Sequence, residues 1–112
     1  MIYRVTIGRA SGIMKCLANT LRLKIFFLLT EGELCVCQLE EILAAEQSMI
    51  SHCLRKMRAE GIVDYRNDGK LRKYFMCSSV SSNGVLRALK KELERSGELD
   101  SYIRRKKELI ER

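Results

Sequence analysis

The stretch from residue 62 to residue 76 constrains the fold of this chain more than any other. Residues 62–66 and 71–76 contain β-branched and aromatic side chains, and the tetrapeptide at 67–70 between them contains Asp68-Gly69. An Asp-Gly pair between two β-prone runs is typical of a tight hairpin, because glycine readily adopts the positive φ that such a turn needs. The sequence therefore predicts a hairpin that covers residues 62–77.

Two short helices are predicted directly before this hairpin. Apolar residues recur at helical spacing in residues 39–45 and again in residues 47–58, and the connection is too short for anything but a corner. In the second run, Ile50, Leu54 and Met57 share one inward face. Two helices and a hairpin in this order form a winged helix-turn-helix, whose second helix enters the major groove while the hairpin tip contacts flanking backbone. We therefore predict a mainly α fold with one small β-hairpin, of the α+β class.

The outward face of residues 47–58 carries small polar and cationic side chains that suit DNA. Amide and hydroxyl groups hydrogen-bond base edges, and arginine reaches guanine or the phosphate backbone. The predicted DNA-contacting residues of the helix and the hairpin are Gln47, Ser48, Ser51, His52, Arg55, Arg58, Arg66, Lys70 and Arg72. A plain solvated helix face is the alternative, although such a face usually carries more glutamate and lysine.

Composition limits the classes of protein to which the chain can belong. Its 112 residues suit one domain, and a net charge of +7 with a pI near 9.4 favours a polyanionic partner. The longest apolar stretch, residues 25–29, is far too short to span a bilayer, and the N-terminus lacks a signal-peptide pattern. We therefore expect a cytoplasmic protein without a membrane partner. We expect no enzyme, because no nucleophile, base and acid form a catalytic set.

Helical flanks are predicted on both sides of the helix-turn-helix. Within a single domain 1–112, the predicted parts are helical flanks at 9–18 and 79–112, a helix-turn-helix at 36–61 and a wing at 62–77. Residues 21–29 are apolar on most of a helix circumference, so this helix should be central to the core. The last flank carries a narrow apolar stripe that could pack on the chain's own core or pair with a twin helix. We favour a homodimer, because one small domain reads too little DNA for useful specificity.

Cys35 and Cys37 form a thiol pair where the first helix of the helix-turn-helix begins. Thiolates select soft ions over hard ones, so the pair suits a thiophilic metal or metalloid, or thiol–disulfide chemistry. Side chains two residues apart point to different faces of a helix. Ion binding is therefore expected to pull residues 35–37 out of helical geometry and to displace the helix at 39–45. The alternative for the pair is that Cys35 fills the core and Cys37 is incidental, and burial is the expected role of Cys16, Cys53 and Cys77.

Four segments of the chain carry a recognisable pattern of motifs. They are Leu17–Ile25 (LANTLRLKI), Glu33–Leu39 (ELCVCQL), Gln47–Leu54 (QSMISHCL) and Ala59–Val63 (AEGIV) before the hairpin. In this order and spacing they resemble the ArsR/SmtB family of bacterial and archaeal metal-responsive repressors. The ELCVCQL segment is similar to the signature ELCVCDL of the arsenic sensors in that family.

The resemblance implies a homodimeric repressor that sits on an imperfect palindrome in double-stranded DNA and leaves when As(III), Sb(III) or another thiophilic ion binds Cys35 and Cys37. It implies no permanently bound cofactor. Many members have a third cysteine three residues further on, where this chain has Glu40. A third ligand could be Cys16, which is our first candidate, or Cys53, Cys77, an added thiol or none. A redox-switched regulator, a ligand-independent DNA-binding regulator and a protein-interaction module stay open as alternatives.

Overall fold

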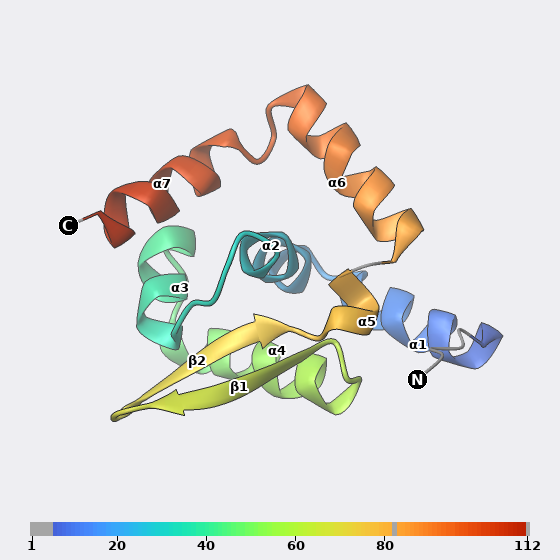
Figure 1. Cartoon of the computed structure of the whole chain (residues 1–112), viewed down its shortest axis with the longest axis horizontal. Helices are drawn as coiled ribbons and strands as arrows, with labels where there is room; N and C mark the ends of the chain where they lie inside the picture. Colours follow the sequence, from blue (N-terminus) through green and yellow to red (C-terminus); the bar gives the residue numbers. More distant parts are fainter. Residues whose placement is uncertain (1–5, 82, 112) are drawn as a thin grey trace.

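The computed structural model describes residues 6–81 and 83–111. Its elements in chain order are α1 (Ile7–Leu17), α2 (Thr20–Leu29), α3 (Val36–Leu43), α4 (Gln47–Ala59), β1 (Val63–Asp68), β2 (Leu71–Met76), α5 (Ser78–Ser81), α6 (Gly84–Ser96) and α7 (Asp100–Ile110). Figure 1 shows α2 in the middle of the molecule, with α4 and the hairpin on one side and α6 and α7 on the other. No helix in the described ranges has the length and apolar character needed to cross a bilayer.

The helix α2 forms the centre of the core, as its nearly all-apolar sequence predicts. Asn19 precedes it in extended conformation, and its side chain accepts a hydrogen bond of 3.0 Å from the backbone N–H of Arg22. This cap satisfies one of the donors that a helix start leaves unpaired. Residues 25–29 are all buried. The helix ends at Leu29, and the N–H and hydroxyl of Thr30 donate to carbonyls of its last turn.

The helices α3 and α4 meet at a corner made by residues 44–46. Ala44 takes the left-handed conformation, with φ 51°, and so turns the chain sharply after α3. The residues that α4 buries are Ile50, Cys53, Leu54 and Met57. The predicted inward face is confirmed, and the opposite face of α4 is left for solvent or a partner. Gly61, with φ 72°, turns the chain from α4 into the hairpin.

The hairpin is a two-stranded antiparallel sheet whose register runs from Val63 opposite Met76 to Asp68 opposite Leu71. Only residues 69 and 70 lie between the strands, and Gly69 has φ 63°, the positive value that the Asp-Gly pair predicts. Leu34, in the loop before α3, adds an isolated bridge to Tyr74 of β2. Helix-turn-helix and wing together confirm the predicted winged helix-turn-helix fold.

The C-terminal region consists of α6 and α7, separated at Gly97, which has φ 79°. In Figure 1 the helix α7 lies over α3 and α2. Leu99 is buried at its start, and Tyr102 and Ile103 pack against the core. The apolar stripe of α7 is therefore used within the chain, which is one of the two arrangements that the sequence allows. Pairing of two chains through residues 9–18 and 79–112 stays a prediction.

Lys106 of α7 is the one buried charged side chain in the described ranges, with 5% of its surface exposed. Its Nζ has no hydrogen-bond partner among the described residues. The ammonium lies against the loop after α2, where a Cβ on Gly32 would approach it to 3.1 Å. Burial lowers the pKa of Lys106, the nearby Glu31 raises it, and Lys90 lowers it further. The site therefore holds a charge that the surroundings only partly compensate.

Lys106→Met should raise the free energy of unfolding near pH 7 by about 1–2 kcal/mol, because methionine fills similar space without a buried charge. The folded state binds the Lys106 proton less tightly than the unfolded state does, since the pKa is lowered. Wild-type stability therefore rises with pH between the folded and unfolded pKa values. The advantage of the variant should shrink as the pH approaches about 10. Urea unfolding across pH measures this, with Lys107→Met at the exposed neighbouring position as control. A loss of stability near pH 7 would contradict the prediction.

Candidate thiol site and nucleic-acid interface

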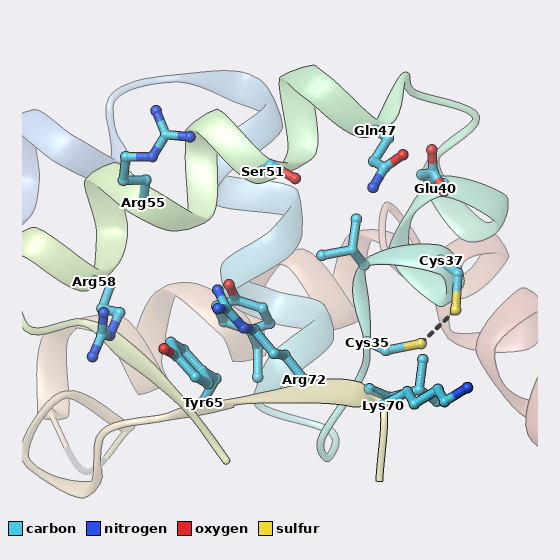
Figure 2. Close-up of a pocket in the computed structure, with 13 residues that line it drawn as sticks. Cys35, Cys37, Glu40, Gln47, Ser51, Arg55, Arg58, Tyr65, Lys70 and Arg72 are labelled. Carbon is cyan, nitrogen blue, oxygen red and sulfur yellow. Dashed lines mark hydrogen bonds between the residues drawn. The ribbon is translucent and has the colours of Figure 1, made fainter. Parts of the chain in front are cut away.

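The thiol groups of Cys35 and Cys37 lie side by side at the start of α3, with 2.6 Å between the two sulfurs (Figure 2). Cys35 is the N-cap residue and has extended backbone, φ −88° and ψ 167°. Cys37 lies in the first turn of the helix. Cys35 is buried and Cys37 is exposed. One ion can bind both sulfurs once they separate slightly, because metal–sulfur bonds of about 2.3 Å at a tetrahedral angle place two sulfurs roughly 3.8 Å apart.

The sequence-based expectation that a helix holds the two thiols on different faces was wrong. It applies only when both residues have helical backbone, and Cys35 lies just outside the helix. The side chain of an N-cap residue folds back over the first turn of the helix, and Cys37 lies in that turn. The pair therefore converges without any unwinding of residues 35–37.

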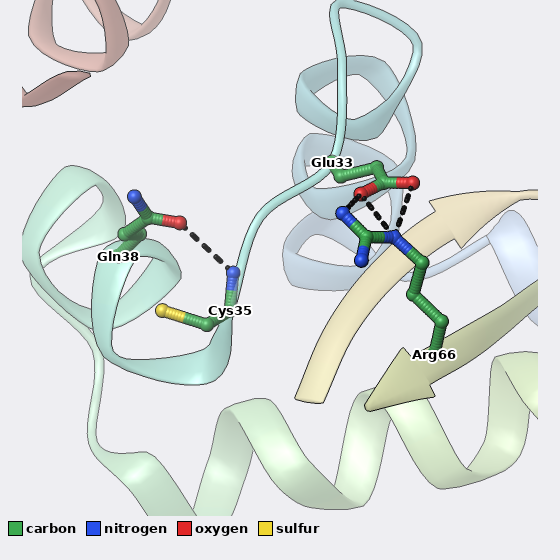
Figure 3. Close-up of polar contacts among 4 residues, drawn as sticks. All are labelled: Glu33, Cys35, Gln38 and Arg66. Atoms are coloured by element: carbon green, nitrogen blue, oxygen red, sulfur yellow. Dashed lines mark hydrogen bonds and ion pairs between the residues drawn. The ribbon is translucent and has the colours of Figure 1, made fainter. Parts of the chain in front are cut away.

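The cap of α3 also fixes the backbone of the thiol segment. The side chain of Gln38 accepts a hydrogen bond of 3.0 Å from the backbone N–H of Cys35 (Figure 3). The hydrogen bond with Cys35, together with burial, raises the pKa of Cys37, although the N–H groups of Gln38 and Cys37 act in the opposite direction. The Cys37 thiol is therefore protonated at neutral pH, and an ion that binds it must displace a proton.

The structure does not bring Cys16 to the pair. Cys16 is buried in α1, and this burial raises the pKa of its thiol. Arg22 lowers that pKa, and Glu60 and Cys53 raise it. In the part of the chain that the structure describes, no three His, Cys, Asp or Glu side chains are arranged to hold a metal. Cys16 as a third ligand of the same chain is therefore not supported, because the helix α1 packs it into the core away from α3.

A cleft of about 690 Å³ opens between the start of α3, the outer face of α4 and the wing. Both thiols line it, together with Glu40. The predicted DNA-contacting residues that line the same cleft are Gln47, Ser51, Arg55, Arg58, Lys70 and Arg72 (Figure 2). The thiol pair and the predicted DNA-reading face are thus parts of one surface, and that surface carries four cationic side chains.

The other predicted DNA-contacting residues lie outside the cleft lining. Ser48 and His52 are exposed on α4. Arg66 is exposed on β1, and its guanidinium is paired with Glu33, with Nη2–Oε2 2.7 Å and Nε–Oε2 2.8 Å (Figure 3). Arg66 lowers the pKa of the Glu33 carboxyl, mainly through its hydrogen bond. Arg66 is therefore exposed at the surface, but its guanidinium already forms an ion pair within the chain.

Tyr65 of β1 organises the cations of the cleft, a role that the sequence did not indicate. The guanidinium groups of Arg58 and Arg72 lie 4.6 Å and 4.5 Å from the centre of its ring. Arg58 is also fixed by Asp64, with Nε–Oδ1 3.0 Å. These contacts join α4 to both strands, and they hold two of the predicted DNA-contacting arginines in place. No local pattern in the sequence signals a tyrosine between two arginines from separate elements.

A helix-turn-helix whose second helix and wing frame one basic cleft is the architecture of a winged-helix DNA-binding regulator. Residues 19–65 match the family model described as "Bacterial regulatory protein, arsR family". The chain belongs to this family, as the motifs in its sequence predict.

Two curated relatives and one solved structure illustrate the match. The putative arsenical resistance operon repressor ArsR of Halobacterium salinarum is 43% identical over 65 residues, which are 56% of this chain and 50% of that protein. The cadmium resistance transcriptional regulatory protein CadC of Listeria innocua is 43% identical over 67 residues, 59% of this chain and 56% of that protein. HlyU from Vibrio cholerae is similar in structure, with TM-score 0.69 and 28% identity over 75% of this chain and 90% of that chain. The chain spans about half the length of these two curated relatives.

Proposed function

We propose that this protein is a transcriptional repressor that releases its operator when a thiophilic ion binds Cys35 and Cys37. The observation that carries the proposal is the convergence of two sulfurs, 2.6 Å apart, in the same cleft as the side chains suited to DNA. Occupation of the pair changes the charge and shape of that surface directly. The inducer must bind the DNA-free conformation more tightly than the DNA-bound one, because the coupling is reciprocal.

The inducing ions that fit the pair are soft ones. The named relatives are regulators of arsenical and of cadmium resistance, which supports As(III), Sb(III) or Cd²⁺ as candidates. Each thiol loses its proton to solvent as its sulfur binds the ion, with no change of oxidation state. Because the described residues bring two thiols together and no third metal-binding side chain, the remaining ligands come from solvent or an added thiol. No permanently bound cofactor is part of this proposal.

The proposed DNA partner is an imperfect palindrome bound by a homodimer in the cytoplasm. Exposed apolar side chains on the outer helices support a dimer, since Ile7 and Met14 of α1 and Val85 of α6 are 92%, 60% and 67% exposed. A symmetric dimer places two recognition helices on successive half-sites, about one helical turn apart. The role assigned to Gln47, Ser51 and Arg55 is contact with bases or phosphates, and Lys70 and Arg72 contact flanking backbone.

A mobility shift on the DNA upstream of the protein's own gene tests this function. Arsenite, antimonite, Cd²⁺, Zn²⁺ and Mg²⁺ are titrated separately against the preformed complex. Release by soft ions but not by Mg²⁺ is the expected result, because thiolates prefer soft ions. A different result would favour an interaction module without an operator. In that case salt weakens the binding, and unrelated DNA competes as well as the upstream DNA does.

A redox switch is the second candidate, and the contact of the two thiols favours it. Peroxide would oxidise the pair to a disulfide, with two thiol protons and two electrons passing to peroxide to form water. Titration of the same complex with peroxide separates the two switches. Release by peroxide alone, with no effect of arsenite or Cd²⁺, would replace the ion-sensing proposal by the redox one.

A further inference from the structure

The loop that leads into the thiol pair is joined to the wing at Leu34. The backbone N–H of Leu34 donates to the carbonyl of Tyr74 at 3.1 Å, and the N–H of Tyr74 donates to the carbonyl of Leu34 at 2.9 Å. Both side chains are buried, with 0% and 9% of their surfaces exposed. Leu34 is therefore tied to β2 by an isolated antiparallel bridge, and Cys35 follows it directly.

Glu33 adds a connection from the same loop to the other strand. Its carboxylate binds the guanidinium of Arg66 on β1 through three contacts, of 2.7 Å, 2.8 Å and 3.1 Å (Figure 3). Three consecutive residues thus differ in what they contact or carry. Glu33 contacts β1, Leu34 contacts β2, and Cys35 carries one of the two thiols. The two residues before Cys35 thus connect the thiol segment to both strands of the wing.

The wing side of this connection leads to the cationic side chains of the cleft. The ring of Tyr74 lies 5.4 Å from the ring of Tyr65. Tyr65 in turn lies between Arg58 of α4 and Arg72 of β2, at 4.6 Å and 4.5 Å. The chain of contacts from the thiol segment therefore ends at two cations from the two elements that are proposed to contact DNA.

Ion binding must change the geometry of the thiol segment. The two thiols are in direct contact without an ion, whereas metal–sulfur bonds of about 2.3 Å at a tetrahedral angle place two sulfurs roughly 3.8 Å apart. The Cys37 side chain is exposed, but Cys35 is packed in the interior beside Leu34. Close-packed interiors respond to such changes by discrete shifts rather than by continuous deformation.

We infer that the Leu34–Tyr74 bridge and the Glu33–Arg66 ion pair transmit occupation of the thiol pair to the wing. When an ion separates the sulfurs, the shift of Cys35 loosens the bridge, and the hairpin with its Tyr65 cation cluster leaves the position that suits DNA. The inference rests on the proposed ion-responsive function and assigns its mechanical link. Tyr74, Glu33 and Arg66 are positioning residues in this link.

Hydrogen exchange in the DNA-free, full-length protein tests the bridge. We expect arsenite or Cd²⁺, each titrated separately, to speed exchange of the Leu34 and Tyr74 amides by about tenfold relative to amides at residues 26–28 in α2. The α2 reference corrects for any overall change of stability on ion binding. The inference would be overturned if the ion changed the exchange rates of the two bridge amides by the same factor as those of the α2 amides.

Glu33→Gln tests the ion pair, with Glu31→Gln as a matched control. Both changes remove one carboxylate from the same loop, but Glu31 pairs with Lys90 of α6, at 2.7 Å, rather than with the wing. For each protein, the DNA dissociation constant is measured with and without the ion. The ratio of the value with the ion to the value without it is then compared between the variants and the wild type. Glu33→Gln should lower the ratio by about two- to fivefold, since an exposed ion pair contributes modestly. Glu31→Gln should leave it unchanged.

The outcomes separate this inference from the proposed function. If neither ion releases DNA from the wild-type protein, the proposed ion-responsive function fails, and the inference fails with it. If the ions release DNA but Glu33→Gln and Glu31→Gln keep the wild-type ratio, the function stands and the ion pair has no part in transmission. Non-additive effects of Glu33→Gln and Arg66→Gln in a double-mutant cycle support direct coupling through the pair.

Discussion

Cys35→Ser and Cys37→Ser should each abolish the release of operator DNA by arsenite or Cd²⁺ and leave ion-free DNA binding intact. Serine keeps the shape of the side chain but replaces a soft ligand by a hard one. The loss should equal the whole coupling between ion and DNA, typically about 1–3 kcal/mol, or roughly a 5- to 150-fold change in DNA affinity. Fluorescence anisotropy with labelled operator, at several ion concentrations, measures it.

The position of each cysteine makes these variants interpretable. Cys35 is the N-cap of α3, where serine is a favoured residue, so α3 should still form. Cys37 is exposed, so its replacement leaves no buried hydroxyl. Cys77→Ser is the control, because Cys77 is a partly exposed cysteine after β2 and does not belong to the cleft lining. Release of DNA by the ion from both Cys35→Ser and Cys37→Ser would place the sensor site elsewhere.

Arg55→Ala should weaken operator binding by about 1–3 kcal/mol, roughly 5- to 150-fold, without changing the oligomeric state. Arg55 is exposed on α4 and lines the cleft, so its guanidinium is available to a base edge or a phosphate. Titration of the operator and of an unrelated duplex at several salt concentrations distinguishes the two contacts. If Arg55 contacts a base, the substitution lowers the preference for the operator over the unrelated duplex. If Arg55 contacts a phosphate, the substitution lowers the salt dependence of binding by about one ion.

Lys56→Ala is the matched control for Arg55→Ala. Each change lowers the net charge of +7 by one, and both positions are exposed on α4. Lys56 acts electrostatically on Cys16 and Cys53, on the side of α4 that faces α1, and the cleft lining does not include it. Its replacement should change operator affinity by less than about twofold. Equal losses in the two variants would mean that general charge, and not the cleft face, binds the DNA.

Much of the fold could be predicted because its signals are local. The Asp68-Gly69 turn, the apolar circumference of α2 and the inward stripe of α4 each depend on residues close together in the sequence. The order of these elements then leaves few arrangements for the chain, since a helix-turn-helix followed by a hairpin packs in one familiar way. The motif resemblance to a known family used the same local segments.

Parts of the candidate site could not be predicted, because they depend on one backbone conformation or on contacts between distant residues. Whether Cys35 is inside the helix or just before it decides whether the thiols diverge or converge, and helix ends are uncertain by one or two residues in sequence. The Glu33–Arg66 pair joins residues that are 33 positions apart. The apolar stripe of α7 likewise gives no indication of which surface covers it.

The unequal depth of the two thiols gives the proposed ion site an order of binding steps. An ion that arrives from solvent meets the sulfur of Cys37 first, because Cys35 is only 3% exposed. Capture is then bimolecular at Cys37 and intramolecular at Cys35, so the second bond forms at a high effective concentration. A soluble thiol that removes the ion has to attack through the same exposed side. In the proposed site, the second sulfur–ion bond should therefore make loss of the ion slower than from a single exposed thiol.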